Sequence, residues 1–187
     1  HWIADRMIDL IEESGPDQPF FAYCSFVDPH HPFDPPKPYG NMYDPDALEV
    51  PVRMEGELLD KPSHFRKALT ARGFSNEKYD YRKLTDHQWG QVKAAYYGMI
   101  TLIDDNIGRI LDALRENGLE KDTLILFTND HGELLGDHGL LFKGPFHYDC
   151  IIKAPMIIKW PGVVPQGSRY SQVTEHVDIM PTLLEYA

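Results

Sequence analysis

An apolar run that ends abruptly in polar residues constrains the fold of this chain more than any other feature. Residues 122–127 contain Leu-Ile-Leu-Phe, a composition typical of a buried β-strand, and Thr128-Asn129-Asp130-His131-Gly132 follows at once. In α/β proteins, polar ligands appear at the carboxyl ends of buried strands. Asp130 and His131 supply one carboxylate and one imidazole, which is half of a divalent-metal site. The pattern predicts an α/β fold with two candidate metal ligands at a sheet edge, although an adjacent Asp and His more often have a surface or hydrogen-bonding role.

The other apolar segments alternate between strand-like and helix-like spacing. Two further short apolar runs predict strands at residues 19–27 and 155–160. Apolar residues spaced by three and four predict helices, at residues 1–14, 85–118 and 173–187. Strands alternating with helices predict an α/β sandwich in which helices flank a largely parallel sheet.

A long irregular segment follows the first predicted strand. Prolines recur throughout residues 28–84 and interrupt both helical and strand periodicity. Loops of this length in compact domains are usually functional or disordered. We expect residues 40–84 to form an irregular excursion on the substrate side of the domain.

Composition narrows the class of partner. With 187 residues, 42% hydrophobic and 25% charged, the chain has the size and composition of one globular domain. Its formal net charge is −11, which argues against nucleic acid as a partner because no stripe of basic residues is available to neutralise phosphates. No apolar stretch approaches the roughly 20 residues needed to cross a membrane. The chain opens at His1 without an initiator methionine, so we expect the true N-terminus to lie outside it and predict no localisation.

Four more residues are candidates for chemistry. Lys143, between Phe142 and Gly144, is placed to put a point charge on an oxyanion, although a solvated lysine covering Phe142 is the more common case. His30 and His31 follow the first predicted strand and suit an acid or an anion-binding role, with an incidental turn as the alternative. His138 lies in a second Asp-His-Gly triplet, where a hydrogen bond within its own loop is the simpler role.

Several motifs, taken together, carry a family resemblance. They are Pro29-His30-x-Pro32-Phe33, Thr128-x-Asp130-His131-Gly132 continuing through Gly136-Asp137-His138-Gly139-Leu140 to Lys143-Gly144, Pro155-Met156-Ile157-Ile158-x-Trp160-Pro161-Gly162, and Val177-Asp178-Ile179-Met180-Pro181-Thr182-Leu183-Leu184. In this order they resemble the sulfatase family of the alkaline-phosphatase-like superfamily. The resemblance spans nearly the whole chain and is weakest over residues 40–84.

The resemblance implies an alkaline-phosphatase-like sandwich and a metal-dependent sulfuric ester hydrolase. Asp130 and His131 would hold the divalent cation, usually calcium, with manganese or magnesium as alternatives. Lys143 would contact the sulfate group, and His30 would contact the ester and assist the leaving group. His31 and His138 are candidates for substrate binding. The implied substrate is a small-molecule or carbohydrate sulfate ester. A metal, a lysine and a protonatable imidazole around one tetrahedral anion would together stabilise its cleavage.

The chain also departs from the family pattern. The family nucleophile is a formylglycine made from the first residue of a Cys-x-Pro-x-Arg or Ser-x-Pro-x-Arg motif, and neither Cys24 nor Cys150 begins one. The early aspartates that complete the family's metal site are also absent. The family's C-terminal subdomain is absent as well. We therefore expect residues 1–187 to be the later part of a catalytic domain, truncated and poorly active by itself, with formylglycine in the missing N-terminal part.

Other functions remain open at this point. Phosphonate monoester hydrolases and phosphodiesterases of the same superfamily also use an Asp-His pair. A non-catalytic module that keeps only the fold would show no effect of replacing Asp130. A simple metal-binding module would need His30, Asp130, His131 and His138 to converge. A truncated sheet would expose an edge or a face, so self-association is a further hypothesis.

Overall fold

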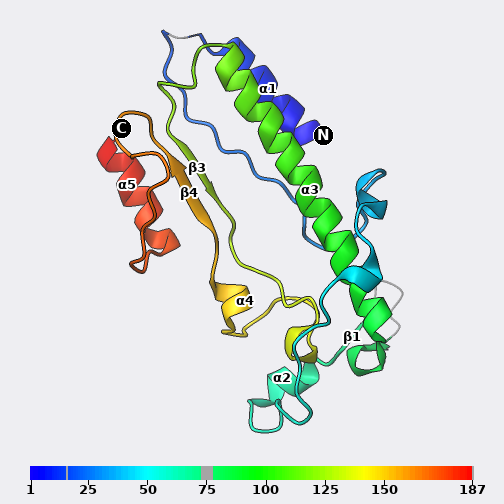
Figure 1. Cartoon of the computed structure of the whole chain (residues 1–187). Coiled ribbons are helices and arrows are strands. Elements are labelled where there is room, and N and C mark those ends of the chain that lie inside the picture. Colours follow the sequence, from blue (N-terminus) through cyan, green and yellow to red (C-terminus); the bar gives the residue numbers. More distant parts are fainter. Residues whose placement is uncertain (16, 73–77, 187) are drawn as a thin grey trace.

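The predicted long helix forms as α3 (Asp86–Glu116), which runs the length of the molecule in the computed structural model (Figure 1). The structure describes residues 1–15, 17–72 and 78–186. Thr85 caps the helix: its side chain accepts a hydrogen bond from the Gln88 N–H, and the Gln88 side chain accepts one from the Thr85 N–H. The helix ends at Asn117, and Gly118 follows with a φ of +73°, a conformation that glycine adopts without strain.

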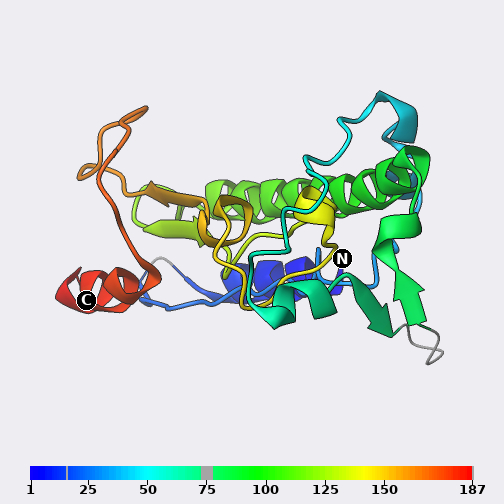
Figure 2. The same cartoon turned by 90° about the horizontal axis from the view of Figure 1, so that it is seen from below.

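The N-terminal helix α1 (Trp2–Glu13) lies alongside the second half of α3 (Figures 1 and 2). The two helices share a small buried core that consists of Ile11, Ala113, Leu114 and Leu119. On the surface, the Arg109 guanidinium lies 2.8 Å from an Asp5 carboxylate oxygen. Both helix predictions are therefore confirmed, to within a few residues at each end.

The sheet that carries the candidate site is antiparallel. Strands β3 (Ile125–Thr128) and β4 (Met156–Lys159) pair with Ile125 opposite Lys159 and Thr128 opposite Met156. The prediction of an α/β chain is confirmed, but a largely parallel sheet is not found among the described residues. A parallel pair needs a crossover, usually a helix long enough to return the chain to the starting edge. The connection here contains the 3-10 turn η4 (Asp137–Gly139) and the single-turn α4 (Asp149–Ile152), and it brings the chain straight back along β3.

The prediction of a strand at residues 19–27 is wrong for this structure. The segment is extended, and its residues from Phe20 to Val27 alternate between half-buried and exposed, as in a strand. However, within the described parts of the chain no backbone partner hydrogen-bonds to residues 19–26. The apolar alternation sets the extended shape, whereas a strand also needs a neighbouring strand to pair with.

The excursion consists of short elements, as its prolines predict. Among the described residues it contains 3-10 turns, one short helix and one antiparallel pair of strands: η1 (Tyr39–Asn41), η2 (Pro45–Ala47), α2 (Ser63–Lys67), β1 (Thr70–Arg72), β2 (Lys78–Asp80) and η3 (Tyr81–Lys83). Two of the turns, η1 and η2, pack directly on α3. Gly98 and Gly90 permit this, because a Cβ there would lie 2.4 Å from the Tyr39 carbonyl and 2.2 Å from the Pro45 carbonyl.

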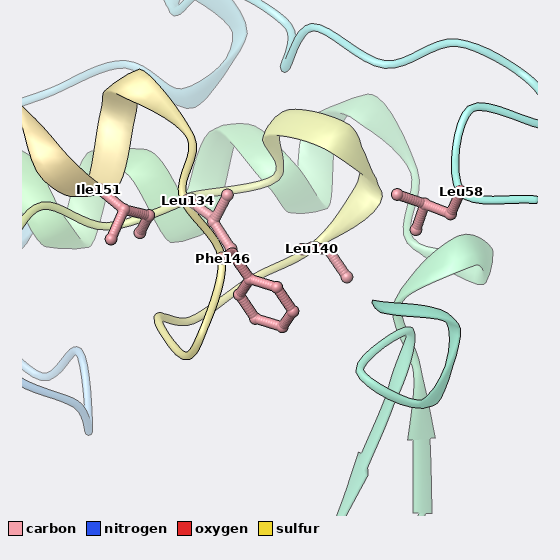
Figure 3. Close-up of a cluster of buried hydrophobic side chains, with 5 residues drawn as sticks. All are labelled: Leu58, Leu134, Leu140, Phe146 and Ile151. Atoms are coloured by element: carbon pink, nitrogen blue, oxygen red, sulfur yellow. The ribbon is translucent and has the colours of Figure 1, made fainter. Parts of the chain in front are cut away.

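A second core joins the excursion to the loop between β3 and β4. It consists of Leu58, Leu134, Leu140, Phe146 and Ile151 (Figure 3). Leu134 and Leu140 are each 1% exposed, so they are among the most completely buried side chains. This core, called here the loop core, holds the segment that carries the candidate site.

The C-terminal helix starts later than its sequence pattern predicts. After the 3-10 turn η5 (His176–Asp178), α5 covers Ile179–Tyr186, and the predicted last residue, Ala187, lies outside the described part. Pro181 falls in the first turn of α5, where a missing N–H costs little. Tyr186 packs edge-on against Trp160, with ring centroids 4.4 Å apart. In the described residues, no helix is both long and apolar enough to cross a membrane.

Candidate active site

The Asp130-His131 pair follows β3 directly, as the sequence predicts. The backbone just beyond it is fixed at Gly132, whose N–H donates to the Ile151 carbonyl oxygen at 2.8 Å. A Cβ at Gly132 would lie only 1.8 Å from the Cys150 carbonyl oxygen, so no larger residue fits this crossing. The segment after β3 and the segment around Cys150 and Ile151 therefore meet directly beside the candidate site.

Asp130 and His131 present donor atoms that suit a divalent cation. The His131 Nδ1–H donates to the Gly132 carbonyl oxygen at 2.9 Å, because a carbonyl oxygen only accepts. This fixes the tautomer and leaves Nε2 with a free lone pair, which is the form that binds metals. Nε2 lies 3.4 Å from Asp130 Oδ2. One cation at roughly 2.0–2.4 Å from each atom would fit this spacing.

Among the described residues, Asp130 and His131 have no third candidate ligand beside them. Within the described ranges, no group of three or more His, Cys, Asp or Glu side chains is arranged to hold a metal ion. The Asp130 side chain is 85% exposed and the His131 side chain 38% exposed, so both are open to further ligands. The pair fits a divalent cation as two ligands of a larger set. His30 and His138 do not converge with Asp130 and His131 into a four-residue site.

The two histidines of the first loop stack on each other and on the residue before Lys143. The His30 and His31 rings lie 4.1 Å apart, and the His31 ring lies 4.5 Å from that of Phe142. Burial lowers the pKa of His31, and the positive charges of His30 and Lys143 lower it further. The lowered pKa favours the neutral form of His31, and His30 is exposed to solvent.

His30 has one ring nitrogen engaged and one available. Its Nδ1–H donates to the His31 carbonyl oxygen at 2.8 Å, so the neutral ring carries its proton on Nδ1 and keeps Nε2 for other contacts. The His31 ring packs on Phe142, the residue before Lys143, so the first loop lies beside the segment that carries the lysine. This arrangement could bind an anionic ester.

Lys143 is paired with a carboxylate that sequence reasoning missed. Its Nζ lies 3.6 Å from Oε2 of Glu133, and the two side chains are 19% and 4% exposed. Burial raises the pKa of Glu133, and the charge of Lys143 opposes that rise. The available signal was a carboxylate two residues after a metal-ligating histidine, but sequence alone does not show that it is buried.

Tyr96 is a second residue that sequence reasoning placed only in the apolar face of α3. Burial raises its pKa to about 12, with the negative charges of Glu133 and Asp130 adding to the effect. Its ring meets Phe33 edge-on at 5.4 Å. Tyr96 therefore stays protonated at neutral pH, and its ring packs on the first loop at Phe33.

His138 is committed to different partners. Its Nδ1 lies 2.7 Å from Oε2 of Glu57, and its ring stacks on Tyr148 at 3.7 Å and 11°. Its backbone has a φ of +58°, and its N–H donates to the Val52 carbonyl oxygen at 2.8 Å. The structure therefore gives His138 the hydrogen-bonding role that was the simpler alternative, although the partner comes from the excursion.

Comparisons with known proteins agree on one family. The family model described as Sulfatase matches residues 2–187. The chain is 38% identical to the arylsulfatase of Clostridium perfringens (strain 13 / Type A), covering 100% of this chain and 38% of that protein. It is 35% identical to the multifunctional alkaline phosphatase superfamily protein PehA of Trinickia caryophylli, covering 90% of this chain and 34% of PehA.

Solved structures give the same result. The phosphonate monoester hydrolase SpPMH of Silicibacter pomeroyi superposes with a TM-score of 0.81 at 33% identity, over 98% of this chain and 37% of that one. The chain therefore spans roughly a third of the length of the curated relatives it matches.

Proposed function

The chain belongs to the sulfatase family, and on that basis we propose that it supplies part of the site of a metal-dependent sulfuric ester hydrolase. The substrate would be a small-molecule or carbohydrate sulfate ester. The observation that carries the proposal is a chain of contacts: the stacked His30 and His31 pack on Phe142, next to Lys143, and Lys143 pairs with Glu133, two residues after His131.

Asp130 and His131 would hold a divalent cation, most favourably calcium, with manganese or magnesium as alternatives. The support is the donor set: a carboxylate oxygen and a free Nε2 that lie 3.4 Å apart. A bound cation would supply positive charge to the tetrahedral group and to charge that develops on it. The remaining ligands would come from outside this chain.

Lys143 and His30 would act on the ester itself. When the bond between sulfur and the bridging oxygen breaks, its electron pair passes to that oxygen, and the leaving alcohol then needs a proton. His30 is exposed, and its imidazole would deliver that proton. The Lys143 ammonium would contact the non-bridging oxygens, where it stabilises negative charge. His31 would line the substrate position, and His138 would support the loop through Glu57.

The nucleophile would lie outside residues 1–187. Burial raises the pKa values of Cys24 and Cys150, which disfavours the reactive thiolate at both positions. Neither cysteine begins the motif that precedes formylglycine formation. We therefore propose that a formylglycine is contributed by polypeptide outside this chain.

Phosphonate monoester hydrolysis is the second candidate function. It is favoured by the match to SpPMH, whose structure resembles this chain over 98% of this chain and 37% of SpPMH. Sulfate and phosphonate monoesters are both singly charged tetrahedral esters, so the same lysine, imidazole and cation would serve either.

A segment exchange tests the proposal. The part of the Clostridium perfringens arylsulfatase that this chain matches is replaced by residues 1–187, and hydrolysis of 4-nitrophenyl sulfate and a 4-nitrophenyl phosphonate ester is measured with calcium and then manganese. We expect the isolated chain to be inactive and the exchanged enzyme to be active. Asp130→Ala and Lys143→Ala should each lower the rate at least about a hundredfold, whereas the exposed control Asp122→Ala should not.

Two results would contradict the proposal. Metal-dependent turnover by the isolated chain would place a nucleophile within it. Full activity of the exchanged enzyme after replacement of Asp130 or Lys143 would remove these residues from the site. The ratio of sulfate to phosphonate turnover decides between the two candidate functions.

A further inference from the structure

The carboxylate of Glu133 is buried beside the candidate anion-binding lysine and has no task in the proposed reaction. Its side chain is only 4% exposed, and its Oε1 has no hydrogen-bond partner among the described residues. Carboxylates are rarely buried to this extent unless a cation compensates them. The compensating cation here is Lys143, whose Nζ lies 3.6 Å from Oε2.

The backbone on both sides fixes this carboxylate in place. The Gly132 N–H donates a hydrogen bond to the Ile151 carbonyl oxygen, and the Leu134 side chain is 1% exposed within the loop core (Figure 3). The backbone on either side of Glu133 is thus held in place.

A carboxylate in this position changes which anions the lysine favours. One positive and one negative charge almost cancel for an anion that approaches both, so the pair exerts little net attraction. Coulomb energy is proportional to the charge of the anion, so the carboxylate repels a doubly charged ester twice as strongly as a singly charged one. Low polarity around a buried pair makes this difference larger than it would be in water.

We propose that Glu133 is a specificity-determining residue that shifts the preference of the Lys143 position toward singly charged tetrahedral esters, such as sulfate monoesters, and away from doubly charged phosphate monoesters. The inference rests on the proposed function, because it takes Lys143 as the group that contacts the tetrahedral oxygens. It adds a reason for the site to discriminate between esters of equal shape and different charge.

The test compares two ligands of matched shape. Binding of phenyl sulfate and of phenyl phosphate to the chain is measured by calorimetry with calcium at about pH 8, where the phosphate ester carries close to two charges because its second pKa is roughly 6. Glu133→Gln removes the charge at nearly constant size. We expect it to shift the ratio of the two affinities toward phenyl phosphate on the order of tenfold.

Two matched variants control for other effects. Glu133→Asp keeps the charge and should keep the ratio close to that of the unchanged protein. Glu120→Gln neutralises a glutamate that also pairs with a lysine, Lys159 at 2.6 Å, but on the surface away from the candidate site, and should leave the ratio unchanged. If circular dichroism shows that Glu133→Gln does not fold, Glu133→Met serves as the second neutral variant.

The outcomes separate this inference from the proposed function. An unchanged affinity ratio in the folded neutral variant overturns the inference, while binding that still depends on Lys143 leaves the proposed function standing. If Lys143→Ala leaves both affinities unchanged, the proposed function fails at this residue and the inference fails with it. A shifted ratio in Glu133→Gln, with Glu133→Asp and Glu120→Gln unshifted, supports the inference.

Discussion

The loop core and the β3–β4 sheet differ sharply in how well each is covered. In the loop core, Leu134 and Leu140 are each 1% exposed, although the surrounding chain has almost no regular structure. In the sheet, which is regular, Ile157 is 61% exposed, and Phe21 of the neighbouring extended segment is 78% exposed. The candidate site is therefore held by the irregular region, and regular structure by itself is a poor guide to where the chain is rigid.

Polar contacts reinforce the same difference. The Val52 N–H donates to an Asp137 carboxylate oxygen at 3.0 Å, and the His138 N–H donates back to the Val52 carbonyl oxygen at 2.8 Å. With the Glu57–His138 pair, these bonds tie the excursion to the loop beyond β3. The fixed geometry at Lys143 and Glu133 follows from this local network.

The largest expected effect is on the loop core. Leu134→Ala should lower the free energy of unfolding by about 3 kcal/mol, because it removes a fully buried side chain and leaves a cavity. Ile157→Ala, in the exposed sheet, should cost less than about 0.5 kcal/mol. Urea unfolding followed by circular dichroism measures both. Equal costs for the two variants would contradict the contrast between the regions.

The crossing at Gly132 should give the next largest effect. Gly132→Ala places a methyl group where the Cys150 carbonyl oxygen now lies, so the two segments must separate. We expect a loss of about 2 kcal/mol. Gly108→Ala in α3 is the control: its Cβ would meet nothing within 4 Å, and it should stabilise the helix by up to about 1 kcal/mol. Thermal unfolding of both variants checks the prediction, which fails if the two shifts have the same sign.

The Glu57–His138 pair should give a smaller, pH-dependent effect. Burial raises the pKa of Glu57, but the hydrogen bond from His138, the Met54 N–H and the charge of Lys61 together bring it below its ordinary value. A lowered pKa in the folded state stabilises the protein above the unfolded pKa of roughly 4.3, and this stabilisation is lost as the pH falls through the folded value.

Glu57→Gln tests this dependence. At neutral pH it should cost roughly 1–2 kcal/mol, which is typical for a hydrogen bond to a charged group. The difference from the unchanged protein should shrink as the pH falls below the ordinary glutamate value. Denaturant unfolding at several pH values measures it. A difference that stays constant across the acid range would show that the charge of Glu57 is not what stabilises the junction.

The smallest effect on stability is expected on the exposed sheet. Ile157→Lys should change the free energy of unfolding by less than about 0.5 kcal/mol. If the chain self-associates through this face, as its exposed apolar residues favour, the same variant should lower the average mass seen by light scattering. A chain that is already monomeric at high concentration would rule out that hypothesis.

Sequence reasoning succeeded where local rules decide the outcome. The spacing of α3, the presence of β3 and β4, and the family motifs were readable because each depends on a few neighbouring residues. The antiparallel direction of the β3–β4 pair could not be predicted, because it depends on how the long connection between the two strands brings the chain back to the sheet. The apolar run at residues 19–27 shows the same limit, because a strand requires a partner that the pattern cannot supply.

The candidate site shows a similar division. Asp130, His131, His30 and Lys143 were predicted because motifs mark them, and the structure packs His31 on Phe142, the residue before the lysine. Glu133 was missed because its importance comes from being buried beside Lys143, a fact of tertiary packing. For His138, the motif did not reveal the pairing with Glu57, which comes from a segment 81 residues away.

Manganese broadening of the histidine NMR signals tests the central claim most directly. The chain has nine histidines, and labelled imidazole rings report separately on each. We predict that the His131 signals broaden at the lowest manganese concentration, well before those of His64, and that Asp130→Ala removes this preference. Simultaneous broadening of His131 and His64, or unchanged preference in Asp130→Ala, would contradict a metal site at the end of β3.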